Sequence, residues 1–167
     1  MPKTYLYIIP AQEYFKNIIK IIKNDIKTKN IIYVTTNKPY KYLVNLLNEE
    51  KIKTENIMFI DCISKQVSGS EDSSEKCVFI DSPQNVTGLS IALNQVITQW
   101  GEESTIIFDS LSTLFIYNSE EIIGRFSNFI INKMQLNNIS SVFFVLESDM
   151  DKKIMSVISS FVDEVRK

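Results

Sequence analysis

One apolar segment of the sequence ends in residues that could do chemistry. The run from Thr105 to Phe108 is followed by Asp109 and then by Ser110. A carboxylate at the end of a buried strand can orient a hydrated Mg²⁺ ion next to a bound phosphate. Mg²⁺ also relies on substrate oxygens, so one carboxylate alone holds it poorly. Asp109 is therefore a candidate for binding a metal or a nucleotide. The alternative is a hydrogen bond to Ser110, Ser112 or a backbone amide.

Polar side chains follow two further strand-like segments. Thr35 and Thr36 end one of them, and Asp61 ends the next. In open α/β sheets, ligands bind outside the carboxyl ends of the strands. These three side chains and Asp109 could therefore line a small polar pocket for a nucleotide or another small molecule. The alternative is structural and is favoured locally, because Thr and Asp also cap helices and loops by hydrogen-bonding backbone amides.

The segment after the first strand lacks the residues of a phosphate-binding loop. Residues 10–14 read PAQEY, and the first glycine of the chain is Gly69. Neither GxxxxGK[ST] nor GxGxxG occurs in the 167 residues, so no motif wraps backbone amides around phosphates. The absence of histidine excludes histidine ligands and histidine general bases. These absences argue against ordinary ATP hydrolysis. Two cysteines, Cys62 and Cys77, make no disulfide scaffold, and Cys62 is expected to be a buried, unreactive thiol.

The order of apolar segments predicts strands that alternate with helices. Strands are expected at residues 5–9, 31–36, 56–61, 77–80, 105–109 and 141–146. Helices are expected at 11–27, from 39 to about 47, at 87–100 with Thr87 as N-cap, at 119–136 with Ser119 as N-cap, and at 151–165. Segment 111–117 is apolar but ambiguous, and segment 64–76 is expected to be a loop. Uninterrupted apolar strands indicate a parallel sheet buried on both faces. The predicted fold is a single three-layer α/β/α domain over residues 1–167, with a mostly parallel twisted sheet of about six strands.

Charge is spread unevenly along the chain. Residues 1–65 hold eleven lysines and six acidic residues, a net charge of +5, and the remainder has a net charge of −7. Four lysines, Lys16, Lys20, Lys23 and Lys27, fall on one face of a predicted helix. A solvated face is favoured over a nucleic-acid stripe, because the chain has only two arginines and a pI near 5.3. Without a signal-like segment or an 18-residue apolar run, we expect a cytoplasmic protein with no membrane contact.

Four segments together resemble a known superfamily. They are YVTTNKP, FIDCIS, FIDSPQNVTGLSIALNQVI and the long run from TIIFDSLSTLF to SSVFFVLES. They resemble the KaiC/RadA-type branch of the RecA superfamily of ATPases, as found in archaea, over roughly residues 5–165. The resemblance implies a RecA-like core and places Asp109 at the Walker B position. Two features depart from the family pattern: PAQEY replaces the Walker A loop, and Thr36, Asn37 and Lys38 stand where the family usually carries a catalytic glutamate.

A RecA-like shell without these parts resembles a degenerate, non-hydrolysing member of the superfamily. The leading hypothesis is a pseudo-ATPase with no catalytic residues, which acts as a regulatory or protein-interaction module with a protein partner or a second copy. No cofactor is expected, and ATP with Mg²⁺ at Asp109 is the weaker alternative. A second hypothesis is a small-molecule or nucleotide-binding protein that does not hydrolyse its ligand. A third, ranked lowest, is a nucleic-acid-associated accessory protein that binds through the lysine-rich first half.

Overall fold

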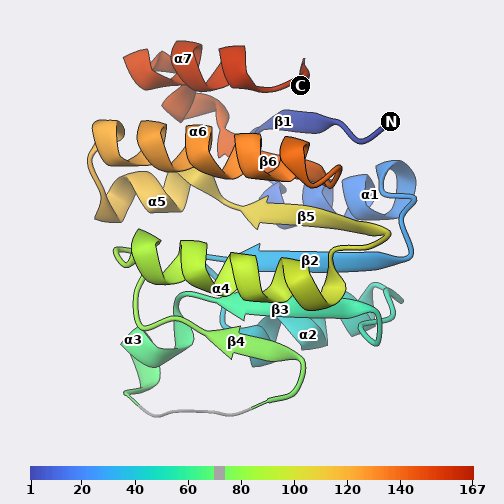
Figure 1. The fold of residues 1–167 in the computed structure, drawn as a ribbon. Helices are drawn as coiled ribbons and strands as arrows, with labels where there is room; N and C mark the ends of the chain where they lie inside the picture. Colours follow the sequence, from blue (N-terminus) through green and yellow to red (C-terminus); the bar gives the residue numbers. More distant parts are fainter. Residues whose placement is uncertain (70–73) are drawn as a thin grey trace.

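A seven-stranded parallel sheet forms the centre of the protein. The computed structural model describes residues 1–69 and 74–167 (Figure 1). The strands are β1 (Thr4–Ile9), β2 (Asn30–Thr35), β3 (Ile57–Asp61), β4 (Cys77–Phe79), β5 (Ser104–Asp109), β6 (Ser140–Leu146) and β7 (Glu164–Arg166). Their order across the sheet is β4-β3-β2-β5-β6-β1-β7, and every neighbouring pair is parallel. The predicted three-layer α/β fold is therefore confirmed.

Helices cover both faces of this sheet. One layer holds α1 (Tyr14–Asp25) and α2 (Tyr40–Glu49), which lie behind the sheet in Figure 1. The opposite layer holds α4 (Val86–Trp100), α5 (Leu111–Tyr117), α6 (Glu120–Leu136) and α7 (Lys153–Phe161). Two short helices, α3 (Ser64–Ser68) and the 3-10 helix η1 (Glu147–Asp151), follow β3 and β6. Because the strands are parallel, the turns that lead from strands into helices lie together at the carboxyl ends of the strands.

Alternation along each strand divides the core into two clusters. In β2, Ile32 and Val34 pack under α4 and α6, whereas Tyr33 packs on the side of α1 and α2. All three side chains have no exposed surface. Each large apolar side chain buried in this way stabilises the fold by about 1.5–3 kcal/mol. Because Asp109 lies two residues beyond Ile107 in β5, it faces the same side as Tyr33.

Several predicted elements differ from the structure. The last helix ends at Phe161, and the chain then forms β7, a seventh strand that pairs with β1. Segment 64–76 begins with helix α3 rather than a loop, and its residues 70–73 lie outside the described residues. The N-cap of α4 is Asn85, not Thr87, because the Asn85 side chain accepts a hydrogen bond from the Gly88 amide at 2.8 Å. The ambiguous segment 111–117 is helix α5, and Ser119 caps α6 as predicted.

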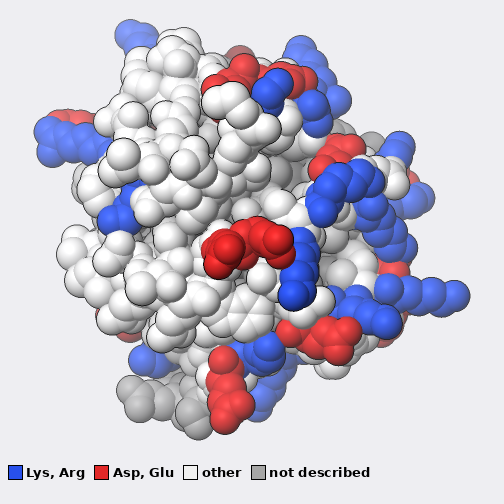
Figure 2. Space-filling model, turned by 45° about the vertical axis from the view of Figure 1, so that its right-hand side comes forward, with Lys and Arg blue, Asp and Glu red and all other residues white. Residues whose placement is uncertain are grey.

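The two helical layers differ in charge. Lysines line the outer side of α1, whereas α4 contains no charged residue in its 15 positions. Figure 2 shows this contrast: Lys and Arg gather at the right, towards α1, and the left side, where α4 and α6 lie, is largely uncharged. The sheet thus separates the layer with the lysine-rich helix α1 from the layer with the uncharged helix α4. No helix among the described residues is long and apolar enough to cross a membrane.

Candidate functional site

Asp109 lies at the carboxyl end of β5, enclosed between the sheet and α1. Its side chain has no exposed surface. One carboxylate oxygen, Oδ1, accepts hydrogen bonds from the Tyr14 hydroxyl at 2.7 Å and from Asn37 Nδ2 at 3.3 Å. The other oxygen, Oδ2, accepts a hydrogen bond from the Tyr33 hydroxyl at 2.7 Å. Burial raises the pKa of Asp109, although these three donors and the nearby Lys38 charge oppose that shift.

Tyr14 comes from the turn that replaces a phosphate-binding loop. Helix α1 begins at this residue, directly after Glu13, whose backbone φ of 57° lies in the left-handed region. The turn therefore directs the first side chain of α1 onto Asp109. Burial and the neighbouring Asp109 carboxyl together raise the pKa of the Tyr14 hydroxyl well above its usual value, so it donates a proton to this hydrogen bond at any ordinary pH.

The backbone next to Asp109 is fixed by Thr36. The Thr36 hydroxyl lies 3.0 Å from the Asp109 carbonyl oxygen and 3.2 Å from that of Ser110, and it accepts from the Ser110 amide at 2.9 Å. The peptide bond between Asp109 and Ser110 is cis. Thr35 has a similar local role, because its hydroxyl bonds the backbone of Lys38. Both threonines are fully buried and tie the strand ends to each other or to the next turn.

Asp61 is also buried, but its contacts are separate from those of Asp109. Its Oδ2 accepts from the Tyr40 amide at 2.7 Å, at the start of α2. Its Oδ1 accepts from the amides of Ile63 and Ser64 at 2.7 and 2.8 Å, and the Ser64 hydroxyl also donates to the carboxylate. The carboxylate thus caps two helix starts, which is the structural alternative that the sequence favoured. Next to it, burial raises the pKa of the Cys62 thiol, which is the form expected for an unreactive cysteine.

A pocket of about 520 Å³ opens beside the Asp109 cluster. Tyr14, Asn37 and Ser110 form its inner wall, and α5 contributes Thr113 and Phe115. At the rim, Asp149 and Lys152 form an ion pair at 3.8 Å, and Lys152 also lies over the Phe115 ring at 5.5 Å. Thr35, Thr36, Asp61 and Asp109 do not themselves line this pocket. Ser110, Tyr14 and Asn37 do line it, so the structure brings Asp109 close to the pocket but places the side chains of Tyr14 and Asn37 between them.

A hydrated Mg²⁺ ion does not fit this arrangement. Mg²⁺ needs oxygen ligands that it can reach, whereas the Asp109 carboxylate has no exposed surface, does not line the pocket and accepts three hydrogen bonds from protein donors. An ion in the pocket could reach this carboxylate only if a side chain that covers it, such as Tyr14 or Asn37, moved away. Among residues 1–69 and 74–167, no group of three acidic or cysteine side chains comes together in a form that could hold a metal.

Sequence reasoning identified Asp109 but missed its three partners. Tyr14, Tyr33 and Asn37 were not among the candidate site residues. The sequence contains one signal that points to them. A tyrosine in an otherwise aliphatic buried strand, such as Tyr33, needs a partner for its hydroxyl, and a strand-end carboxylate is the nearest acceptor that a parallel sheet offers.

Comparison with known proteins places the chain in a family. The model of a family of unknown function, DUF7504, matches residues 23–165. The chain belongs to the DUF7504 family. This match includes Tyr33, Asn37 and Asp109, whereas Tyr14 lies before the matched range. No match to a curated protein is found.

Two solved structures share the fold of this DUF7504 protein. A KaiC-like protein from the hyperthermophilic archaeon Pyrococcus horikoshii superimposes with a TM-score of 0.65 at 11% sequence identity. The flagellar accessory protein FlaH from Methanocaldococcus jannaschii superimposes with a TM-score of 0.61, also at 11% identity. Each alignment covers 98% of this chain and 69% of the other. The RecA-like α/β fold implied by the sequence resemblance is therefore confirmed.

Proposed function

We propose that this chain is a degenerate RecA-like protein, of archaeal type, that does not hydrolyse ATP and acts as a regulatory or protein-interaction module. One observation carries the proposal. The carboxylate at the Walker B position, Asp109, is fully buried and engaged by protein donors, with Tyr14 and Asn37 on one oxygen and Tyr33 on the other. A hydrolytic site keeps this carboxylate available for the hydrated metal ion. Here it serves as the centre of a buried hydrogen-bond network.

The turn that stands in place of a phosphate-binding loop supports the same proposal. A P-loop supplies backbone amides and a lysine to the phosphates, and in this chain the corresponding turn supplies the phenol ring of Tyr14 instead. The Tyr14 hydroxyl lies 2.7 Å from Asp109 Oδ1. The side chain therefore fills space next to the carboxylate and links α1 to β5. Such a network stabilises one arrangement of the shell, which is what an interaction module with no chemical cycle requires.

A second candidate function is binding of a small molecule without hydrolysis. The observation that favours it is the pocket of about 520 Å³, because pockets of about 300–1,000 Å³ are the usual size for small ligands. Its walls combine apolar side chains such as Phe115 and Leu146 with hydroxyl groups of Ser112 and Thr113. An uncharged or zwitterionic polar compound suits this lining better than a triphosphate, since the one lysine at the rim is already paired with Asp149.

The first experiment combines phosphate release with thermal unfolding. Purified wild-type protein is incubated with ATP and Mg²⁺, beside the variants Asp109→Asn and Lys16→Gln. We expect no phosphate release above background in any of them. We also expect no rise in melting temperature with ATP, ADP or GTP at millimolar concentration. A nucleotide present at 100 times its Kd would stabilise the fold by about 2.7 kcal/mol, which such a scan detects easily.

Each possible result has a defined meaning. Hydrolysis by the wild type that is lost in Asp109→Asn and kept in Lys16→Gln would overturn the proposal. A nucleotide-dependent melting shift without hydrolysis would replace it by the second candidate function. The Lys16→Gln control changes an exposed lysine of α1 that lies outside the Asp109 network and outside the pocket. It therefore reports effects of charge alone.

A further inference from the structure

A groove runs between α1 and the β1–β7 edge of the sheet, away from the Asp109 pocket. Its larger part is a hollow of about 450 Å³ over the amino ends of β1, β5 and β6, with Tyr5, Thr105 and Val142 in its lining. A smaller hollow of about 240 Å³ continues along β1 towards Pro10 and shares Tyr7, Asn24 and Asp25 with the first. We refer to the two hollows together as the α1–β7 groove. Neither hollow contains a residue of the Asp109 network.

The charged residues of the α1–β7 groove are mostly cationic. Lys27 and Arg166 line the larger hollow, and Lys20 and Lys167 line the smaller one. Asp25 is the one acidic residue in the lining, and its Oδ2 already accepts the Tyr7 hydroxyl at 2.7 Å. The side-chain ammonium groups of the three lysines form no ion pair or hydrogen bond with any described residue.

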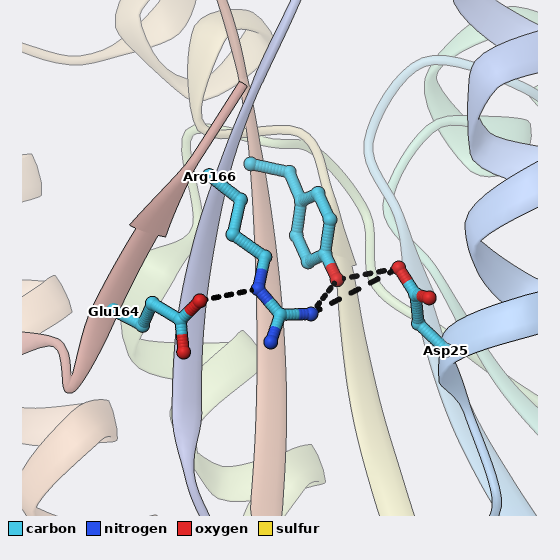
Figure 3. Close-up of polar contacts among 4 residues, drawn as sticks. Asp25, Glu164 and Arg166 are labelled. Atoms are coloured by element: carbon cyan, nitrogen blue, oxygen red, sulfur yellow. Dashed lines mark hydrogen bonds and ion pairs between the residues drawn. The ribbon is translucent and has the colours of Figure 1, made fainter.

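Arg166 is held in place at the edge of this groove (Figure 3). It pairs in register with Tyr7 on the neighbouring strand, so both side chains point to the same face of the sheet. Its Nε donates to Glu164 at 2.7 Å, its Nη1 donates to the Tyr7 hydroxyl at 2.8 Å, and the guanidinium lies over the Tyr5 ring at 4.3 Å. These contacts, together with Asp25 at 4.0 Å, fix the plane of the guanidinium before any ligand arrives.

One end of the fixed guanidinium remains available. Within the described part of the chain, Nη2 of Arg166 has no acceptor, and Figure 3 shows that nitrogen without a dashed contact. The Glu164 carboxylate and the Tyr7 hydroxyl raise the pKa of the Arg166 guanidinium, so this group stays charged at any ordinary pH. The Ser140 hydroxyl also lines the hollow; it accepts one weak bond from the Lys3 amide at 3.4 Å and is free to donate its own proton.

We propose that the α1–β7 groove binds the phosphoryl group of a small, soluble phosphorylated compound. Arg166 Nη2 and the Lys27 ammonium group would supply the charge, and Ser140 a further donor. A phosphoryl dianion matches this set better than a carboxylate does, because three lysines of the lining have no acidic partner among the described residues, whereas the Asp25 and Glu164 carboxylates are already engaged by Tyr7 and Arg166. The unengaged Nη2 of Arg166 presents charged N–H donors to phosphate oxygens. A fixed guanidinium loses little side-chain entropy when the ligand binds.

Pyrophosphate is the probe that tests this site. Binding is measured by isothermal titration calorimetry with the wild type and with Lys27→Gln, Arg166→Gln and Lys16→Gln. We expect saturable binding with one site, at least tenfold weaker in Lys27→Gln and in Arg166→Gln. The Lys16→Gln variant is the matched control, since it removes an α1 lysine that lies outside the groove, and its affinity should equal that of the wild type. Glutarate, a dicarboxylate, should bind at least tenfold more weakly than pyrophosphate.

Several outcomes would overturn the assignment. The first is absence of pyrophosphate binding at millimolar concentration. The second is a loss of affinity in Lys16→Gln as large as in Lys27→Gln, because it would mean that pyrophosphate is attracted by the positive charge of the α1 lysines in general. Preference for glutarate would replace the phosphoryl group by a carboxylate. Arg166→Gln also removes the contact that holds β7 to Tyr7, so its unfolding is measured in parallel. The Lys27→Gln variant touches no such contact and keeps the test valid if β7 becomes loose.

Discussion

At the scale of residues, Asp109 shows how a strand-end carboxylate can serve a structural purpose. The apolar run before Asp109 made it a candidate for binding a metal or a nucleotide. In the structure, the groups around its carboxylate are hydrogen-bond donors from three different elements: α1, β2 and the turn after β2. Buried charges persist in proteins only where hydrogen bonds or opposite charges compensate for the loss of water. The two tyrosine hydroxyls provide that compensation here, and they connect the sheet to α1 at the same time.

The tyrosine hydroxyls should therefore contribute strongly to stability. We expect Tyr14→Phe and Tyr33→Phe each to lower the free energy of unfolding by about 1.5–3 kcal/mol, the usual cost of losing a hydrogen bond to a charged group. Because both hydroxyls bond the same carboxylate, the double variant should not be additive. Urea unfolding of the two single variants and the double variant measures these free energies. Tyr42→Phe is the control, since Tyr42 is 56% exposed and should change stability by less than about 0.5 kcal/mol. Equal effects at all three positions would contradict this role for Asp109.

At the scale of elements, the strands and long helices could be predicted from the sequence. Uninterrupted apolar runs fit strands buried on both faces, and most predicted bounds lie within one or two residues of those observed. The short elements could not be predicted. Strand β7 has three residues and exists because Glu164 and Arg166 pair with β1, a contact between distant parts of the chain. Helix α3 depends on Asp61, which caps its first turn through the amides of Ile63 and Ser64.

The same lesson applies to the candidate site. Asp109 is visible in sequence because an apolar run precedes it. Its partners are not, because Tyr14 and Tyr33 reach it only through the packing of α1 on the sheet and the pairing of β2 with β5. Local sequence patterns report which residues are buried. They do not report which hydroxyl reaches which carboxylate, since that depends on side-chain positions 76 and 95 residues away from Asp109.

The start of α4 provides a direct test of one local rule. Sequence preference alone allows Thr87 as N-cap, whereas the structure assigns the cap to Asn85, whose Oδ1 accepts from the Gly88 amide at 2.8 Å. We expect Asn85→Ala to lower the free energy of unfolding by about 1 kcal/mol, the typical cost of losing an N-cap. Thr87→Ala, on the exposed side of α4, should change it by less than about 0.5 kcal/mol. Thermal unfolding of the two variants decides between the two caps. A larger loss of stability in Thr87→Ala than in Asn85→Ala would support Thr87 as the N-cap, as the sequence predicted.

At the scale of the whole molecule, the charge asymmetry of the chain becomes an asymmetry between layers. The first 65 residues, with their excess of lysine, form α1 and α2 behind the sheet, and the later residues form the opposite layer. The Asp109 network and the α1–β7 groove both use the α1 side. They differ in position along the strands: Asp109 ends β5, whereas the larger hollow of the groove reaches Thr105 and Ser140 near the starts of β5 and β6.

This separation predicts that the two regions act independently. A strand of six residues spans about 20 Å, and substitutions more than about 7–10 Å apart with no shared partner are usually additive within about 0.3–0.5 kcal/mol. Tyr14 shares no hydrogen-bond partner with Lys27 or Arg166. Tyr14→Phe should therefore leave the pyrophosphate Kd within a factor of two of the wild-type value, while Lys27→Gln raises it at least tenfold. Calorimetry on the two single variants and the double variant measures this. If Tyr14→Phe changed the Kd severalfold, a change at the Asp109 end of α1 would have to reach the groove at the other end of the helix, and the two regions would not be independent.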